Sequence, residues 1–131
     1  MTGIPPSSPA RARVRGTAAQ SRGVWAEDRA CAALVADGWA ILARRMQTGA
    51  GEIDIVAERA GLLAFVEVKA RPDLATAAAA LSGRQQARLL MAGEAALAAH
   101  PGWGAAGVRF DVMVVDGTGQ VRRIADAFRT G

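Results

Sequence analysis

The sequence predicts an α/β fold in which a central mixed β-sheet is flanked by helices. Two segments repeat apolar residues at the helical period, and five segments either alternate them as strands do or consist of β-branched runs. The predicted order of these elements is α-β-β-β-α-β-β. That order favours a layered α/β arrangement. The chain has 131 residues, 51% of them hydrophobic, which suffices for one domain with a substantial core.

The first element is a helix predicted over residues 21–37. Its apolar stripe also contains Glu27 and Cys31, and Gly38 follows as a C-terminal stop signal. Residues 39–46 are predicted as the first strand, whose end is left undefined by two consecutive arginines.

A β-hairpin is predicted next, with strands at residues 52–58 and 62–70. Ala60-Gly61 supplies the turn between them, and Pro72 ends the second strand because proline cannot donate to a strand ladder. The hairpin is the most informative part of the sequence, since it places charged residues among apolar ones.

The last elements are a helix over residues 82–99, a β-branched strand over 108–115 and a short strand over 120–124. Ser82 is a suitable helix N-cap, and Pro101 with the glycine after it closes the helix. An Asp-Gly-Thr-Gly sequence is predicted as the turn between the two final strands.

Residues 1–20 are predicted to be a disordered basic tail and residues 21–131 to be the folded domain. The first 22 residues contain four arginines and no acidic residue, whereas the rest of the chain holds 12 basic and 12 acidic residues. The net charge of +4 therefore comes from this end of the chain. Such a tail either binds phosphates without sequence preference or is simply solvated.

The sequence contains neither an apolar run long enough to span a membrane nor a second cysteine to pair with Cys31. We therefore expect a cytoplasmic protein without a membrane partner, since an unpaired thiol fits a reducing compartment.

The hairpin sequence predicts a cluster of opposed charges on one face. With a turn at Ala60-Gly61, Asp54 lies opposite Glu67 and Glu52 lies opposite Lys69, the only lysine in the chain. Strand alternation puts Val56 and Phe65 on this same face and Ile53 on the opposite face, which is predicted to be the core. Opposed carboxylates destabilise a sheet unless a cation lies between them or a pKa rises strongly. Oxygen ligands at this spacing suit Mg²⁺, and Lys69 could orient an attacking water or stabilise charge on a phosphate. The alternative is a solvated outer face with Glu52 and Lys69 as a surface pair.

A third carboxylate, Glu27, lies on the apolar stripe of the first helix, where an unpartnered charge is costly. It either approaches the hairpin face and completes a ligand set, or lies at the edge of the stripe and reaches water.

These residues resemble the PD-(D/E)xK nuclease pattern and, more closely, the YraN-like bacterial family, which is similar to Holliday-junction resolvases. The resemblance runs from about Gly23 to Phe128. It is carried by Gly23 with Glu27, Gly38, Gly51-Glu52-Ile53-Asp54, Phe65-Val66-Glu67-Val68-Lys69 with Arg71, Gln86, Arg109-Phe110-Asp111-Val112 and Asp126-Ala127-Phe128.

The resemblance implies a restriction-endonuclease-like fold and hydrolysis of DNA phosphodiester bonds, with branched DNA as a substrate. It implies Asp54 and Glu67 as ligands of Mg²⁺ or Mn²⁺, Lys69 as the catalytic lysine, and Glu27 as a helix-borne catalytic carboxylate and metal ligand. It also implies a homodimer, because junctions are two-fold symmetric.

The sequence departs from the family pattern at two positions. Arg45 stands where the family often has asparagine, and Gln85 stands where it often has a lysine. Arg71, Gln85 and Gln86 are expected to contact nucleic acid. Because nuclease-like folds also host proteins that only bind, the alternative function is a non-catalytic nucleic-acid-binding or adaptor protein.

Other residues are expected to be structural. His100 is predicted to cap a helix, and Arg109 with Asp111 to form an ion pair near the sheet edge. The tryptophans Trp25, Trp39 and Trp103 are expected to be buried or partly buried, without forming a base-stacking platform.

Overall fold

The computed structural model describes residues 23–74 and 81–128. A five-stranded sheet has the order β1-β2-β3-β4-β5. Only β3 and β4 are parallel to each other; the other neighbours are antiparallel. The strands are β1 (Ala40–Thr48), β2 (Gly51–Arg59), β3 (Leu62–Ala70), β4 (Gly107–Val115) and β5 (Val121–Phe128).

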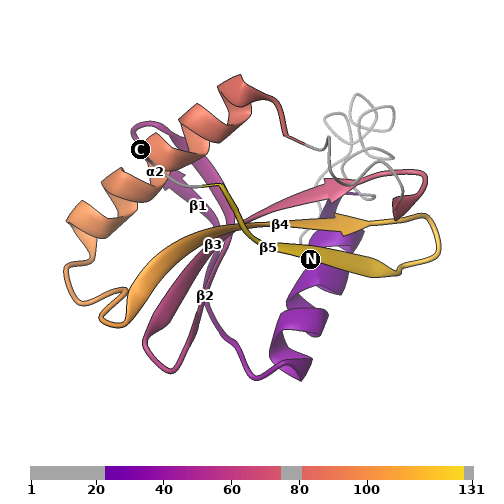
Figure 1. Cartoon of the computed structure of the whole chain (residues 1–131), viewed down its shortest axis with the longest axis horizontal. Coiled ribbons are helices and arrows are strands. Elements are labelled where there is room, and N and C mark those ends of the chain that lie inside the picture. Colours follow the sequence, from indigo (N-terminus) through magenta and orange to yellow (C-terminus); the bar gives the residue numbers. More distant parts are fainter. Residues whose placement is uncertain (1–22, 75–80, 129–131) are drawn as a thin grey trace, which may run out of the picture.

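Two helices flank this mixed sheet, which confirms the predicted α/β, restriction-endonuclease-like fold class (Figure 1). A helix over residues 23–36 packs Ala30 and Leu34 against one face of the sheet. Helix α2 (Gly83–Ala99) packs Leu89 and Ala92 against the other face. Neither helix within the described residues is long and apolar enough to cross a membrane. The predicted tail over residues 1–20 lies outside the described residues.

The predicted hairpin register is confirmed. Ile55 pairs with Val66 and Arg59 with Leu62, as a turn at Ala60-Gly61 requires. Ala60 has a φ of 54° and Gly61 a φ of 81°, so both turn residues adopt the left-handed conformation.

The expectation that one face of the hairpin is apolar and the other polar is wrong. Val56 and Phe65, assigned to the polar face, are fully buried, and they pack with Leu89 of α2. Ile53, assigned to the opposite face, belongs to this same cluster. Because a helix covers each side of the sheet, both faces of the hairpin form core, and the cluster of Asp54, Glu67 and Lys69 lies at the end away from the turn.

Helix α2 begins and ends as predicted. Ser82 is its N-cap and forms a capping box with Gln85, while His100 is the C-cap and stacks on Trp103 at 3.8 Å between ring centroids. A Cβ atom on Gly93 would lie 2.8 Å from the Phe110 ring, so glycine permits the close approach of α2 to the sheet.

Strand β5 extends to Phe128, four residues beyond the predicted end. The backbone N–H of Asp126, whose φ is 54°, donates to Asp111 Oδ1 at 2.7 Å. This contact and the irregular register between Phe110 and Val112 hold the end of β5 against β4. A sequence pattern does not reveal such a long-range anchor.

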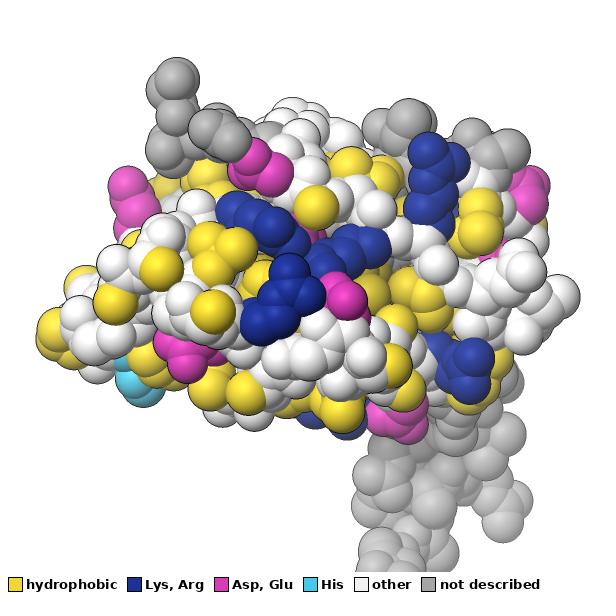
Figure 2. Space-filling view, turned by 60° about the horizontal axis from the view of Figure 1, so that its bottom comes forward, with side chains coloured by type: hydrophobic (Ala, Val, Ile, Leu, Met, Phe, Trp, Pro, Cys, Tyr) yellow, Lys and Arg dark blue, Asp and Glu magenta, His cyan; other side chains and the backbone are white. Residues whose placement is uncertain are grey.

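The predicted ion pair of Arg109 with Asp111 is confirmed as part of a larger, buried cluster. Arg123 also binds Asp111, and the guanidinium groups of Arg59, Arg109 and Arg123 lie 4.7–5.1 Å from the centroid of the buried Trp39 ring. Asp111 itself is fully buried, and Figure 2 shows basic side chains gathered on the face that lies at the bottom of Figure 1.

Candidate metal centre

The predicted site lies where the pairing between β2 and β3 ends. The last backbone pair on this side is Ile55 with Val66. Beyond this pair, a side chain replaces the backbone as the hydrogen-bond acceptor. Asp54 Oδ2 accepts a hydrogen bond from the Val68 N–H at 2.8 Å. This bond holds the Asp54 carboxylate beside Glu67, in the neighbouring strand.

Glu67 is a buried carboxylate whose two oxygens have unequal surroundings. Its Oε2 lies 3.3 Å from Lys69 Nζ and 3.8 Å from Arg88 Nη2. Its Oε1 is buried and has no hydrogen-bond partner among the described residues. A buried carboxylate oxygen without a partner is costly, and it marks a position where an absent ligand would be stabilised.

The surroundings of Asp54 also disfavour a negative charge. Burial, followed by the negative charge of Glu67, raises its pKa to about 7, although the Val68 hydrogen bond acts in the opposite direction. Glu27 and Glu52 add smaller contributions of the same sign as Glu67. Three other carboxylates therefore act on Asp54 at this end of the hairpin.

These surroundings fit a divalent cation. Hard ions such as Mg²⁺ prefer carboxylate oxygens and require one or two of them, with water completing the shell. The unpartnered Glu67 Oε1 and the neighbouring Asp54 carboxylate provide such donors. Within residues 23–74 and 81–128, however, no three His, Cys, Asp or Glu side chains form a ready-made metal-binding group. The site thus rests on two carboxylates.

Glu27 is buried on the apolar stripe, as its position in the sequence predicted, but it has partners of its own. Its Oε1 accepts from Arg44 at 3.3 Å and from Arg45 at 3.1 Å. Arg45 has a φ of 52°, a conformation uncommon for a residue with a side chain. The two arginines therefore neutralise Glu27 at the edge of the site.

The alternative interpretation, a surface pair of Glu52 and Lys69, does not match the contacts. Lys69 pairs with Glu67, and the side chain of Glu52 accepts a hydrogen bond from Gln47 at 2.7 Å. The lysine is also mostly buried, with 16% of its side chain exposed. Lys69 therefore belongs to the Asp54–Glu67 cluster.

Comparison with known proteins identifies the family of the chain. Residues 26–115 match the model of the uncharacterised protein family UPF0102. The chain belongs to this family. It is 60% identical over 116 residues to a UPF0102 protein of Granulibacter bethesdensis, covering 88% of this chain and 73% of the relative. It is 47% identical over 124 residues to a UPF0102 protein of Azorhizobium caulinodans, covering 95% and 93%.

UPF0102 is the YraN-like family, so the predicted resemblance is confirmed. The matched region contains Glu27, Asp54, Glu67 and Lys69. The chain is similarly related to a Rhodopseudomonas palustris UPF0102 protein, with 53% identity over 114 residues, covering 87% of this chain and 85% of the relative.

The two departures of this UPF0102 chain from the family pattern have local structural explanations. The Gln85 side chain accepts from the Ser82 N–H at 3.0 Å and so completes the capping box of α2. Arg45 pairs with Glu27. Both side chains therefore have partners inside the domain.

The residues expected to contact nucleic acid form hydrogen bonds with nearby backbone groups. Gln86 Nε2 donates to the Leu81 carbonyl at 3.5 Å, and Arg71 Nη1 donates to the Ala70 carbonyl at 2.8 Å. Together with Gln85, they remain predicted contacts.

Arg88 is a further site residue, whose place in the sequence fits either a phosphate contact or an ordinary surface arginine. Its Nη1 donates to the Glu52 carbonyl at 3.3 Å, and its Nη2 approaches Glu67. A Cβ atom on Gly51 would lie 3.1 Å from Arg88 Nη1. The available signal was its position one helical turn after Gln85, on the same face of α2.

Proposed function

We propose that this UPF0102 protein is a divalent-metal-dependent endonuclease that hydrolyses phosphodiester bonds in DNA, with branched DNA as its preferred substrate. One observation carries the proposal: a buried glutamate oxygen without a partner among residues 23–74 and 81–128 lies next to an aspartate whose pKa is raised to about 7. Carboxylates crowded in this way, beside a lysine, are suited to binding a cation and a phosphate together.

Asp54 and Glu67 would hold Mg²⁺ or Mn²⁺ through their carboxylate oxygens. When bound, the ion supplies Lewis acidity toward a phosphoryl oxygen and lowers the pKa of a coordinated water. Lys69, 3.3 Å from Glu67 Oε2, presents an ammonium group that can orient a water or stabilise negative charge developing on the phosphate. Arg88 adds a second positive charge from α2.

Glu27 has a conditional role in this proposal. Its charge already acts on Asp54. Direct participation as a ligand requires its pairs with Arg44 and Arg45 to open. Phosphate groups of DNA would compete for the same guanidinium groups, since arginine binds phosphate and carboxylate with the same fork of donors.

The cellular setting follows from the same reaction. A nuclease acting on chromosomal DNA works in the cytoplasm, and the reduced state of Cys31 is compatible with that compartment. Symmetric cleavage of a four-way junction needs two active sites, so the protein acts as a homodimer. The molar mass in solution, with and without junction DNA, tests this assembly.

The function is tested by cleavage of labelled duplex, single-stranded, flapped and four-way-junction DNA with Mg²⁺ or Mn²⁺. Wild type should cut at least one branched substrate, and Asp54→Asn should not. Glu94→Gln, which removes an exposed carboxylate on α2, is the control and should cut as wild type does. Equal cleavage by Asp54→Asn would overturn the proposal.

The second candidate is a non-catalytic nucleic-acid-binding or adaptor protein. The observation that favours it is the neutralisation of Glu27 by two arginines. This function predicts DNA binding that falls when residues 1–22 are removed, with no metal-dependent cutting by the wild type on any substrate. Unchanged binding by the truncated chain together with metal-dependent cutting would exclude it.

A further inference from the structure

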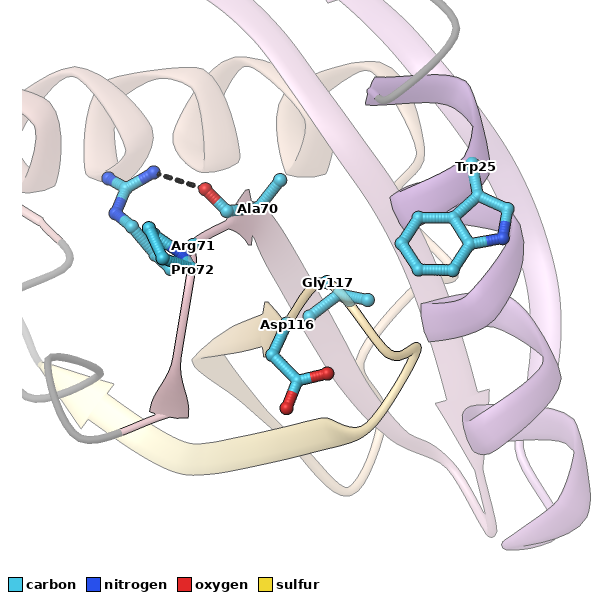
Figure 3. Close-up of a pocket in the computed structure, with 7 residues that line it drawn as sticks. Trp25, Ala70, Arg71, Pro72, Asp116 and Gly117 are labelled. Atoms are coloured by element: carbon cyan, nitrogen blue, oxygen red, sulfur yellow. Dashed lines mark hydrogen bonds between the residues drawn. The ribbon is translucent and has the colours of Figure 1, made fainter.

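A cavity of about 290 Å³ lies at the carboxyl ends of β3 and β4. Its walls come from three places: the first helix, the ends of β3 and β4, and the turn after β4 (Figure 3). The lining residues are Trp25, Ala70, Arg71, Pro72, Val115, Asp116 and Gly117. Its volume is at the lower end of the roughly 300–1,000 Å³ typical of small-molecule pockets, so it suits a single ring system.

The position of the cavity connects it with the proposed reaction. Ala70 and Arg71 directly follow Lys69, and Trp25 precedes Glu27 by two residues. Ala70 pairs with Val115 in the parallel part of the sheet, so the carboxyl ends of two parallel strands form one wall. Ligands of open α/β sheets bind at such strand ends.

Trp25 is the feature that indicates what the cavity holds. The tryptophan is partly buried, as expected, and 40% of it is exposed; the sequence did not indicate it as a stacking platform. In Figure 3 its indole extends from the helix toward the space bounded by Ala70 and Gly117. An exposed aromatic ring costs free energy in water, which stacking on another flat ring recovers.

The wall around Trp25 is held in place. Arg29, one turn along the same helix, donates through Nε to the Gly119 carbonyl at 3.2 Å and so ties the β4–β5 turn to the helix. A Cβ atom on Gly119 would lie 3.3 Å from Trp25 Cζ2. Asp116 Oδ1 accepts from the Thr118 and Gln120 N–H groups, at 2.9 and 3.0 Å, which fixes the turn itself.

The rim of the cavity carries a positive side chain at one side and a negative side chain at another. Figure 3 shows Arg71 and Trp25 on opposite sides of the cavity, with Asp116 between them along the lower edge. Arg71 attracts a phosphate on its side, whereas the Asp116 carboxylate repels one on the other.

We propose that this cavity binds one unpaired nucleobase of the DNA strand next to the bond that is cut, stacked on the indole of Trp25. The inference rests on the proposed function and specifies its substrate: DNA that has an unpaired nucleotide at the branch. A base inside a duplex is stacked between neighbours and cannot enter, so the cavity selects flaps, overhangs and opened junctions over plain duplex.

The test is equilibrium binding by fluorescence anisotropy at low salt with EDTA, so that no cleavage occurs. The probes are a duplex with a single-stranded overhang and the same molecule whose overhang has sugar and phosphate but no bases. Wild type should prefer the base-bearing probe. Trp25→Ala should lose about 5- to 150-fold in affinity for that probe, while Trp25→Phe keeps most of the affinity.

The base-free probe separates stacking from a general structural effect of the substitution. Trp25→Ala and wild type should bind it equally. Val35→Ala, which removes apolar surface from the same helix at a residue 58% exposed, should bind both probes as wild type does. Equal binding of both probes by wild type, or an equal loss on both probes by Trp25→Ala, would overturn the inference.

The two proposals can fail separately. If Trp25 governs binding of unpaired bases but wild type cuts no DNA, the cavity assignment stands and the nuclease function fails. If wild type cuts branched DNA and Trp25→Ala cuts it with the same affinity and preference, the nuclease stands and the cavity assignment fails. If wild type binds no DNA at low salt, both fail.

Discussion

Asp111 and Glu67 are buried carboxylates in neighbouring strands, yet their oxygens differ in how many hydrogen bonds they accept. Val66 pairs with Asp111 and Glu67 with Val112 in the parallel ladder, so the two residues are one position apart. Asp111 Oδ1 accepts from Arg109 and from the Asp126 N–H, and its Oδ2 accepts from Arg109 and Arg123. Glu67 Oε1 has no hydrogen-bond partner within the described residues.

The difference distinguishes a structural carboxylate from one that is ready to bind a ligand. Asp111 is enclosed by two guanidinium groups that also stack on Trp39, so the whole unit is complete without any ligand. Glu67 stands beside Asp54, and their positive neighbours do not fill the available oxygens. Removing charge should therefore damage stability at one carboxylate and function at the other.

The largest expected effect on stability follows from replacing Asp111. Asp111→Asn removes the buried carboxylate that Arg109 and Arg123 share, and Arg123 keeps only its pair with the exposed Asp37, at 3.4 Å. We expect the free energy of unfolding in urea to fall by about 3–5 kcal/mol, as for other buried ion pairs that lose one member. Cleavage per folded molecule should not change.

Glu67→Gln is the matched variant in the neighbouring strand. It should leave the free energy of unfolding within about 1 kcal/mol of wild type, because it relieves the repulsion from Asp54 while losing pairs with Lys69 and Arg88. It should also abolish metal-dependent cleavage. Similar losses of stability in the two variants would contradict the contrast between these carboxylates.

A smaller effect concerns pH. Because burial and the charge of Glu67 raise the pKa of Asp54 from 3.8 to about 7, the folded chain binds a proton in this interval that the unfolded chain releases. The metal-free protein should therefore lose stability as pH rises from about 4 to about 7, on the order of 1 kcal/mol per pH unit, and level off above it.

Urea unfolding of wild type and Asp54→Asn in EDTA, at several pH values across this interval, checks the slope. The difference between the two curves should grow in favour of the variant as pH rises. Parallel curves would mean that Asp54 does not titrate in this range. Added Mg²⁺ should flatten the wild-type curve, since a bound cation favours the ionised carboxylate.

The smallest expected effect concerns Arg88. Arg88→Gln removes a positive charge 3.8 Å from Glu67 Oε2, which competes with a cation for that carboxylate. Mn²⁺ affinity should rise about two- to fivefold, while DNA affinity falls by a similar factor, as expected for one partly exposed charge worth about 1 kcal/mol or less. Arg84→Gln, an exposed arginine one turn earlier on α2, should leave Mn²⁺ affinity unchanged. A fall in Mn²⁺ affinity in Arg88→Gln would contradict this role.

The sequence was informative where local rules determine the structure. The Ala60-Gly61 turn sets the hairpin register, and that register brings Asp54, Glu67 and Lys69 to one end of the hairpin. The ends of α2 were predicted from Ser82 and His100, because helix caps depend on neighbouring backbone groups alone. The α/β class followed from the order of such elements.

The sequence was less informative where distant segments meet. The burial of Val56 and Phe65 depends on where α2 docks, which strand alternation does not specify. The approach of Arg88 to Glu67 depends on the same docking. Glu27 was placed correctly on its helix, but its arginine partners come from β1, whose end the sequence left undefined. The exposure of Trp25 likewise depends on the turn after β4.

The most direct test of the metal site is a Mn²⁺ titration followed by electron paramagnetic resonance of the free ion, comparing wild type with Asp54→Asn and Glu94→Gln. We predict one site per chain in wild type and in Glu94→Gln, and its loss in Asp54→Asn. Binding of the ion by Asp54→Asn with unchanged affinity, or no binding by wild type, would contradict the assignment of Asp54 and Glu67 as the metal ligands.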